Sequence, residues 1–124
     1  MELDELNARV TEVILRAERL AAGSDEAREA FREVGRIEES IADLTPAHDL
    51  EGEIARLGAV TAALSAADPL RALWLVDLYL AEGVSPEAAA KLDALRAEAD
   101  TELAEAASTV PPVRPVKYIL REAA

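Results

Sequence analysis

A helical periodicity fills residues 3–44 on both sides of Gly23-Ser24, LDELNARVTEVILRAERLAAGSDEAREAFREVGRIEESIADL. Apolar residues recur there at alternating steps of three and four, the spacing of helices that pack side by side in coiled-coil fashion. They are Leu3, Leu6, Val10, Val13, Ala17 and Leu20, followed by Ala27, Ala30, Val34, Ile37, Ile41 and Leu44. Because the Gly23-Ser24 link is short, the two helices must turn back on each other. These residues therefore predict an N-terminal antiparallel helical hairpin.

Capping residues followed by proline divide the rest of the chain. Thr45-Pro46, Asp68-Pro69 and Ser85-Pro86 each place a side-chain acceptor at an N-cap and a proline at the first helical position. Gly23 and Gly83 stand where helices should end, since glycine adopts the left-handed conformation without strain. The predicted helices are residues 2–22, 25–44, 46–66, 69–82 and 86–108. Since no segment alternates with period two, we expect an all-α fold, about five helices in a bundle, without a sheet.

The predicted helix 46–66 carries two kinds of residue on its surface. Its expected seam is Ala47, Leu50, Ile54, Leu57, Thr61 and Leu64. Gly52 and Gly58 also lie in its interior, where each costs up to about 1 kcal/mol relative to alanine. These glycines, like Gly35 in the helix before, are either tolerated defects or places where another backbone approaches closely.

The predicted helix 69–82 is apolar on every face. Its apolar residues are Leu70, Leu73, Trp74, Leu75, Val76, Leu78, Tyr79 and Leu80, with Asp77 as the one charge between Arg71 and Glu82. Such a helix is either the centre of the bundle or is covered by a partner.

The C-terminal part of the chain changes character after residue 108. The predicted helix 86–108 has a seam at Ala88, Leu92, Leu95, Ala99, Leu103 and Ala106. The prolines of residues 109–115 cannot continue a helix and should run extended. After them comes a short apolar and basic segment, residues 116–122. We therefore divide the chain into a helical bundle, residues 1–108, and a Pro-rich extended segment with a short apolar-basic tail, residues 109–124.

Composition excludes several classes of function. The 124 residues carry 25 acidic and 13 basic side chains, a net charge of -12, so direct nucleic-acid binding is not expected. The longest strictly apolar run, residues 72–76, is far shorter than the roughly 20 residues that span a bilayer. The acidic N-terminus lacks the positive region of a secretory signal. We expect a soluble, cytoplasmic protein without membrane contact, and the absence of cysteine excludes disulfide and thiol chemistry.

The residues that could carry catalysis are better explained structurally. His48 is the single histidine, placed by the prediction in the first turn of a helix, and lies three positions before Glu51. A metal pair is conceivable, but a solvent-facing residue beside first-turn acids is the favoured interpretation. Carboxylate pairs such as Glu38-Glu39 and Asp25-Glu26 fall where the hairpin needs a solvated face and should pair with its arginines. We expect no enzymatic activity, no catalytic or metal site and no cofactor.

The remaining features favour an interaction protein: an adaptor, an assembly factor or a small subunit of a larger complex. It would bind a protein partner through apolar helix surfaces and the tail, and would self-associate, most simply as a homodimer. The candidate partner-binding residues are Trp74, Tyr79, Val113, Arg114, Val116, Lys117, Tyr118, Ile119, Leu120 and Arg121. The tail either folds back on the bundle or docks on a partner. The alternative function is an acidic antagonist, an antitoxin or nucleic-acid mimic, that covers a basic surface.

Overall fold

The computed structural model describes residues 2–109, which form five helices and contain no strand. The helices are α1 (Glu2–Arg19), α2 (Asp25–Asp43), α3 (Leu50–Ser65), α4 (Pro69–Ala81) and α5 (Pro86–Thr109). The predicted all-α fold is confirmed. Of the predicted tail, residues 109–124, only Thr109 lies within the described residues, as the last residue of α5.

Most of the predicted helix boundaries have the expected chemistry. The side-chain oxygens of Ser24, Asp68 and Ser85 accept hydrogen bonds from backbone N–H groups three residues on, at 3.1, 3.2 and 3.1 Å. Gly23 and Gly83 have φ angles of 76° and 85°, so both turns use the left-handed region that glycine enters most easily.

The predicted start of the third helix at Pro46 is wrong. The Thr45 hydroxyl donates a 2.7 Å hydrogen bond back to the Ile41 carbonyl, so its side chain closes the end of α2 and does not cap α3. Residues 46–49 form a turn closed by the Asp49 N–H and the Pro46 carbonyl at 3.2 Å. Because α3 begins at Leu50, His48 lies in this turn and not in a helix.

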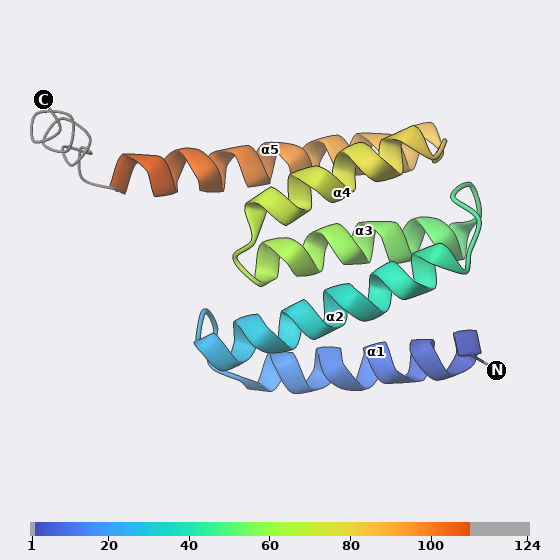
Figure 1. Cartoon of the computed structure of the whole chain (residues 1–124), viewed down its shortest axis with the longest axis horizontal. Helices are drawn as coiled ribbons and strands as arrows, with labels where there is room; N and C mark the ends of the chain where they lie inside the picture. Colours follow the sequence, from blue (N-terminus) through green and yellow to red (C-terminus); the bar gives the residue numbers. More distant parts are fainter. Residues whose placement is uncertain (1, 110–124) are drawn as a thin grey trace, which may run out of the picture.

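The helices stack side by side in chain order, from α1 at one edge of the molecule to α5 at the other (Figure 1). Within residues 2–109, α1 packs only against α2, while α3 packs against α2, α4 and α5. The centre of the fold is therefore α3, and the predicted possibility of a central fourth helix is wrong. One face of α4 is buried, by Ala72, Leu75, Val76 and Tyr79, and its other face is open.

The prediction of which face of the third helix is buried is also wrong. Leu50 and Ile54 are 74% and 59% exposed, while the buried face of α3 carries small residues and one arginine. These buried residues are Gly52, Ala55, Arg56, Ala59, Val60, Ala62 and Ala63. Small side chains let α2 approach closely: a Cβ added to Gly35 would lie 3.5 Å from that of Ala62. The predicted seams of α1, α2 and α5 are confirmed in their central residues, such as Val13, Ile41 and Leu92.

Arg56 joins three helices from the inside of the fold. Its guanidinium donates to the carbonyls of Gly52, Ala42 and Thr45 at 3.0, 3.0 and 3.1 Å. It also pairs with Glu82 at 3.2 Å. With only 4% of the residue exposed, Arg56 satisfies the carbonyl end of α2 and ties it to the end of α4.

Candidate functional site

An exposed apolar stripe runs along α4. Leu70, Trp74 and Leu78 are 68%, 54% and 41% exposed, and their spacing of four places them on one helix face. The Arg71 guanidinium carbon lies 4.6 Å from the centre of the Trp74 ring, a cation–π contact. Arg71 also pairs with Glu39 of α2, so the arginine that covers the indole is itself held in place. We call these three residues the α4 stripe.

Tyr79, the other aromatic candidate on α4, has the opposite orientation. It is 3% exposed, and the guanidinium carbon of Arg56 lies 5.6 Å from its ring centre. Burial raises the pKa of its hydroxyl. Tyr79 therefore belongs to the interior, and of the two aromatic candidates on α4 only Trp74 is exposed.

A second open surface lies between α1 and α3, two helices that do not pack against each other and are linked by a side-chain hydrogen bond from Asn7 to Glu51. Two hollows with empty volumes of about 610 and 730 Å³ meet at Glu38 and Ile54 and form a continuous groove above α2. We call it the α1–α3 groove. The first hollow is lined by Asn7, Glu38, Ile41, Leu50, Glu51, Ile54 and Ala55. The second is lined by Ile14, Phe31, Val34, Glu38, Ile54, Leu57, Gly58, Thr61, Ala62 and Ser65.

Glu38 is the unusual residue of this groove. Only 8% of it is exposed, and no donor within residues 2–109 makes a hydrogen bond or an ion pair to its carboxylate. Burial raises the pKa of Glu38 to about 7, because the charged form loses water without gaining a partner. Its carboxylate lies against α3 where that helix has Gly58, since a Cβ there would overlap the Glu38 side chain.

The prediction that Glu38 and Glu39 share a solvated face is therefore wrong for Glu38. Glu39 does lie at the surface, where it pairs with Arg71. A signal for the difference exists in the sequence: Phe31, Val34, Glu38 and Ile41 follow the same three-and-four spacing as an apolar seam. A hairpin alone needs only one buried face on α2, but α2 packs against both α1 and α3 and therefore buries a second face, which includes Glu38.

The other acids of the hairpin behave as predicted. Asp25 pairs with Arg28, and Arg32 pairs with Glu29 at 2.8 Å. Glu33 of α2 pairs with Arg16 of α1 at 2.6 Å, and this hydrogen bond holds the pKa of Glu33 below its usual value. These are exposed ion pairs, each worth less than about 1 kcal/mol.

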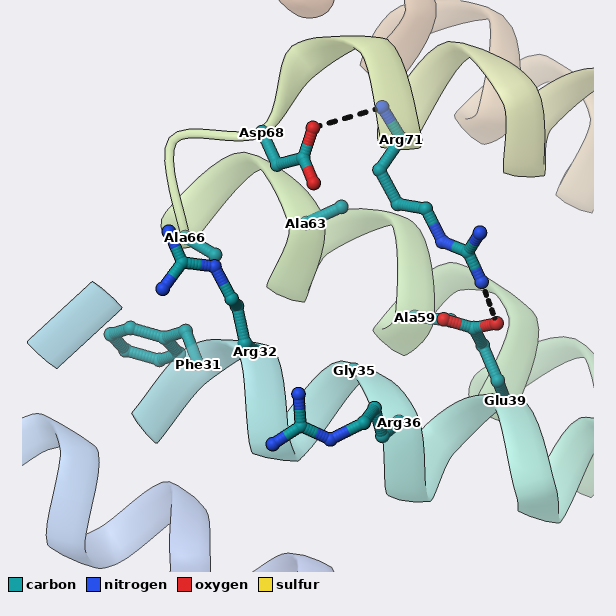
Figure 2. Close-up of a pocket in the computed structure, with 10 residues that line it drawn as sticks. All are labelled: Phe31, Arg32, Gly35, Arg36, Glu39, Ala59, Ala63, Ala66, Asp68 and Arg71. Atoms are coloured by element: carbon teal, nitrogen blue, oxygen red, sulfur yellow. Dashed lines mark hydrogen bonds and ion pairs between the residues drawn. The ribbon is translucent and has the colours of Figure 1, made fainter. Parts of the chain in front are cut away.

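A third hollow opens on the other side of α3, between α2 and the start of α4 (Figure 2). Figure 2 shows Arg32 and Arg36 of α2 on one side and Arg71 of α4 on the other, above a floor formed by the alanines of α3. Each guanidinium already has an acidic neighbour: Glu29 lies 2.8 Å from Arg32 and 3.7 Å from Arg36, and Glu39 pairs with Arg71. The hollow thus has internally balanced charges and is a weaker candidate for a ligand than the α1–α3 groove.

His48, the candidate metal ligand of the sequence, lies at the surface. The imidazole is 78% exposed, with its Nε2 3.7 Å from an Asp49 oxygen. Across residues 2–109, no three His, Asp or Glu side chains come together as they would around a metal ion. In the same part of the chain, none of the helices combines the length and the apolar character needed to cross a membrane.

The predicted tail contacts fall outside the described residues, which end at Thr109. They are Val113, Arg114, Val116, Lys117, Tyr118, Ile119, Leu120 and Arg121. No family model, curated protein or solved structure matches the chain. The α4 stripe and the α1–α3 groove are therefore the two surfaces on which a function can be argued.

Proposed function

We propose that the protein is a non-enzymatic helical interaction module that binds a protein partner through the α4 stripe. The observation that carries the proposal is the exposure of Leu70, Trp74 and Leu78 on the outer face of a helix whose inner face is fully packed. Three large apolar side chains in one row exceed what scattered surface residues require and are typical of a contact surface.

The stripe has the physical features of a binding hot spot. Tryptophan contributes most to protein interfaces when its ring enters a pocket that excludes water. Arg71 covers one part of the indole and is anchored to Glu39, which limits the motion that binding would otherwise have to freeze. The partner that fits is a protein with an apolar cleft able to take an indole and two leucine side chains.

Adaptor, assembly factor and small subunit remain the roles that we propose for such a module. The C-terminal segment from Val113 to Arg121 is proposed as a second contact, and a cytoplasmic location is part of the same proposal. The alternative role, an acidic antagonist of a basic surface, differs in its physics. Its binding would weaken steeply with salt, whereas apolar docking persists.

The experiment is a quantitative capture from source cells at physiological and at high salt, comparing the wild-type chain with Trp74→Ala. The matched control is Leu15→Ala, which truncates an apolar side chain that is 51% exposed on α1. We expect the captured protein to be lost with Trp74→Ala, kept with Leu15→Ala and retained at high salt. Equal capture by both variants would overturn the role of the stripe, and loss at high salt would favour the antagonist.

A further inference from the structure

The α1–α3 groove contains a carboxyl group that no donor of residues 2–109 pairs with. Glu38 is 8% exposed, and its oxygens keep contact with the water of the groove, where a ligand can reach them. Neither of the two hollows is lined by a lysine or an arginine. Glu51, in the first hollow, adds a second acid, which accepts a 3.2 Å hydrogen bond from Asn7.

These features define what the groove can hold. Ile14, Phe31, Ile54 and Leu57 require an apolar occupant, because only an apolar surface gains by excluding water from them. The Glu38 carboxylate at the floor requires that the occupant also carry a cationic donor, which would form a charge-assisted hydrogen bond out of contact with water. The fitting ligand is thus an apolar segment with one lysine or arginine.

One segment of this chain has that chemistry. Residues 116–121, VKYILR, combine four apolar or aromatic side chains with Lys117 and Arg121. Residues 111–124 carry three bases and one acid on a chain whose net charge is -12. Opposite charge and matching apolar character therefore single out this segment.

We propose that residues 116–121 of one copy dock in the α1–α3 groove of a second copy, where Lys117 or Arg121 pairs with Glu38. The second copy is favoured by the length of α5, which has 24 residues against 13 in the antiparallel α4. The difference corresponds to about 16 Å at 1.5 Å per residue. Figure 1 shows the end of α5 projecting beyond the other helices. A two-fold pair exchanges both segments and satisfies both grooves.

This docking assigns the proposed second contact of the C-terminal segment to another copy of the chain and uses a surface other than the α4 stripe, so the role of the stripe and the docking fail independently. The first test measures the dimer dissociation constant of the full chain by sedimentation. Glu38→Gln should weaken the dimer by about tenfold or more, because a charge-assisted hydrogen bond is lost. The matched control Glu51→Gln removes the same charge from an exposed acid of the same groove and should change the constant by less than about threefold.

The charge pairing is tested by combining variants. Lys117→Ala with Arg121→Ala should weaken the dimer as much as Glu38→Gln does, and adding Glu38→Gln to them should have little further effect. A wild-type chain that stays monomeric at about 100 µM would overturn the proposal. So would a dimer that Glu38→Gln leaves unchanged while circular dichroism shows the variant to be folded.

A second test uses the absence of cysteine from the chain. Thr61→Cys, in the groove, combined with Ile119→Cys should form a disulfide that links two copies under mild oxidation. The control pairs Ile119→Cys with Ser40→Cys. Ser40 is exposed one turn beyond Arg36, which lines the hollow on the other side of α3. Equal cross-linking in the two double variants, or a disulfide found only within single chains, would overturn docking in a second copy.

Discussion

Arg56, on α3, and Glu38, which lies against α3, are both ionisable and both more than nine-tenths buried, yet their surroundings are opposite. Arg56 donates to three backbone carbonyls and pairs with Glu82. Glu38 receives no hydrogen bond from residues 2–109. A buried charge whose partners are all supplied by the fold is part of the architecture. A carboxyl group that has no such partners among residues 2–109 and reaches the water of an open groove can accept a donor from outside the fold.

The two sides of α3 also differ in rigidity. On the Arg56 side, Gly52 faces the Pro46 carbonyl, which belongs to the backbone of a tight turn. On the Glu38 side, Gly58 faces the end of a side chain that lines an open groove. The first side cannot yield without moving the chain, whereas the second can yield by moving one carboxylate. Substitutions of Arg56, Glu38 and the two glycines test these differences.

The largest expected effect is the loss of Arg56. Arg56→Ala removes a side-chain donor from three backbone carbonyls, of which that of Ala42 keeps the Thr45 N–H, and removes the ion-pair partner of Glu82; it should lower the free energy of unfolding by about 3–5 kcal/mol. Urea denaturation followed by circular dichroism measures it. Arg56→Lys should recover only part of the loss, since an ammonium cannot reproduce the planar fork. A loss below about 1 kcal/mol would contradict the conclusion that Arg56 holds α2, α3 and the end of α4 together.

Next in size is the contrast between the two glycines. Gly52→Ala should cost about 2 kcal/mol or more, because its Cβ meets backbone that cannot move aside. Gly58→Ala should stay within about 1 kcal/mol of wild type, since alanine favours the helix and the Glu38 carboxylate can swing into the groove. The same denaturation experiment measures both variants. Equal costs would show that the two sides of α3 are equally rigid.

Replacing Glu38 should raise the free energy of unfolding, whereas replacing Arg56 or Gly52 should lower it. Burial raises the pKa of Glu38 from 4.5 to about 7. Between these values the folded chain keeps a proton that the unfolded chain releases, so the free energy of unfolding falls as pH rises from about 4.5 to 7. Glu38→Gln should therefore stabilise the fold by about 1–2 kcal/mol near pH 8, and by nearly nothing near pH 4.5. The gain is limited because the amide is also buried.

This measurement needs a background without the proposed docking. Lys117→Ala with Arg121→Ala removes the cations that would otherwise pair with Glu38 and oppose the effect. In the part of the chain that the structure describes, Glu51 is the other titratable group lining the groove; α1 contributes Asn7 and Ile14, and α2 contributes otherwise apolar residues. The pH dependence can thus be attributed to Glu38. A Glu38→Gln variant that is less stable near pH 8 than near pH 4.5, relative to its parent, would reverse the assignment.

The sequence predicts the hairpin, the caps at Ser24, Asp68 and Ser85 and the number of helices because each depends on local chemistry. It does not predict which face of α3 is buried. Leu50, Ile54, Leu57, Thr61 and Leu64 form one seam with three-and-four spacing, and Gly52, Ala55, Ala59, Ala62 and Ala66 form a second with the same spacing. Hydrophobicity alone selects the first seam. The structure buries the second, because α3 is packed on several sides and small residues allow the closest approach.

Because a local sequence pattern does not state how helices pack, the sequence also does not predict the α1–α3 groove. Burial of Glu38 depends on α1 and α3 lying on either side of α2, which is a tertiary arrangement that no local pattern states. Arg56 was equally invisible, because its partners at Ala42, Thr45 and Glu82 come from three separate places in the chain. One sequence signal marks both Glu38 and Arg56: each is a charged residue at a position of the three-and-four helical spacing that is otherwise filled by apolar or small residues.

The smallest expected effect on folding concerns Trp74, a large residue that lies outside the hydrophobic core. More than half of it is exposed, so Trp74→Ala should lower the free energy of unfolding by at most about 1 kcal/mol, most of it from the lost contact with Arg71. A buried tryptophan would cost about 3–5 kcal/mol. Leu75→Ala is the matched control on the buried face of the same helix, where 1% of the leucine is exposed, and it should cost about 2–5 kcal/mol. Denaturation curves in which Trp74→Ala costs as much as Leu75→Ala would place the indole in the core, and the α4 stripe would no longer be a surface available to a partner.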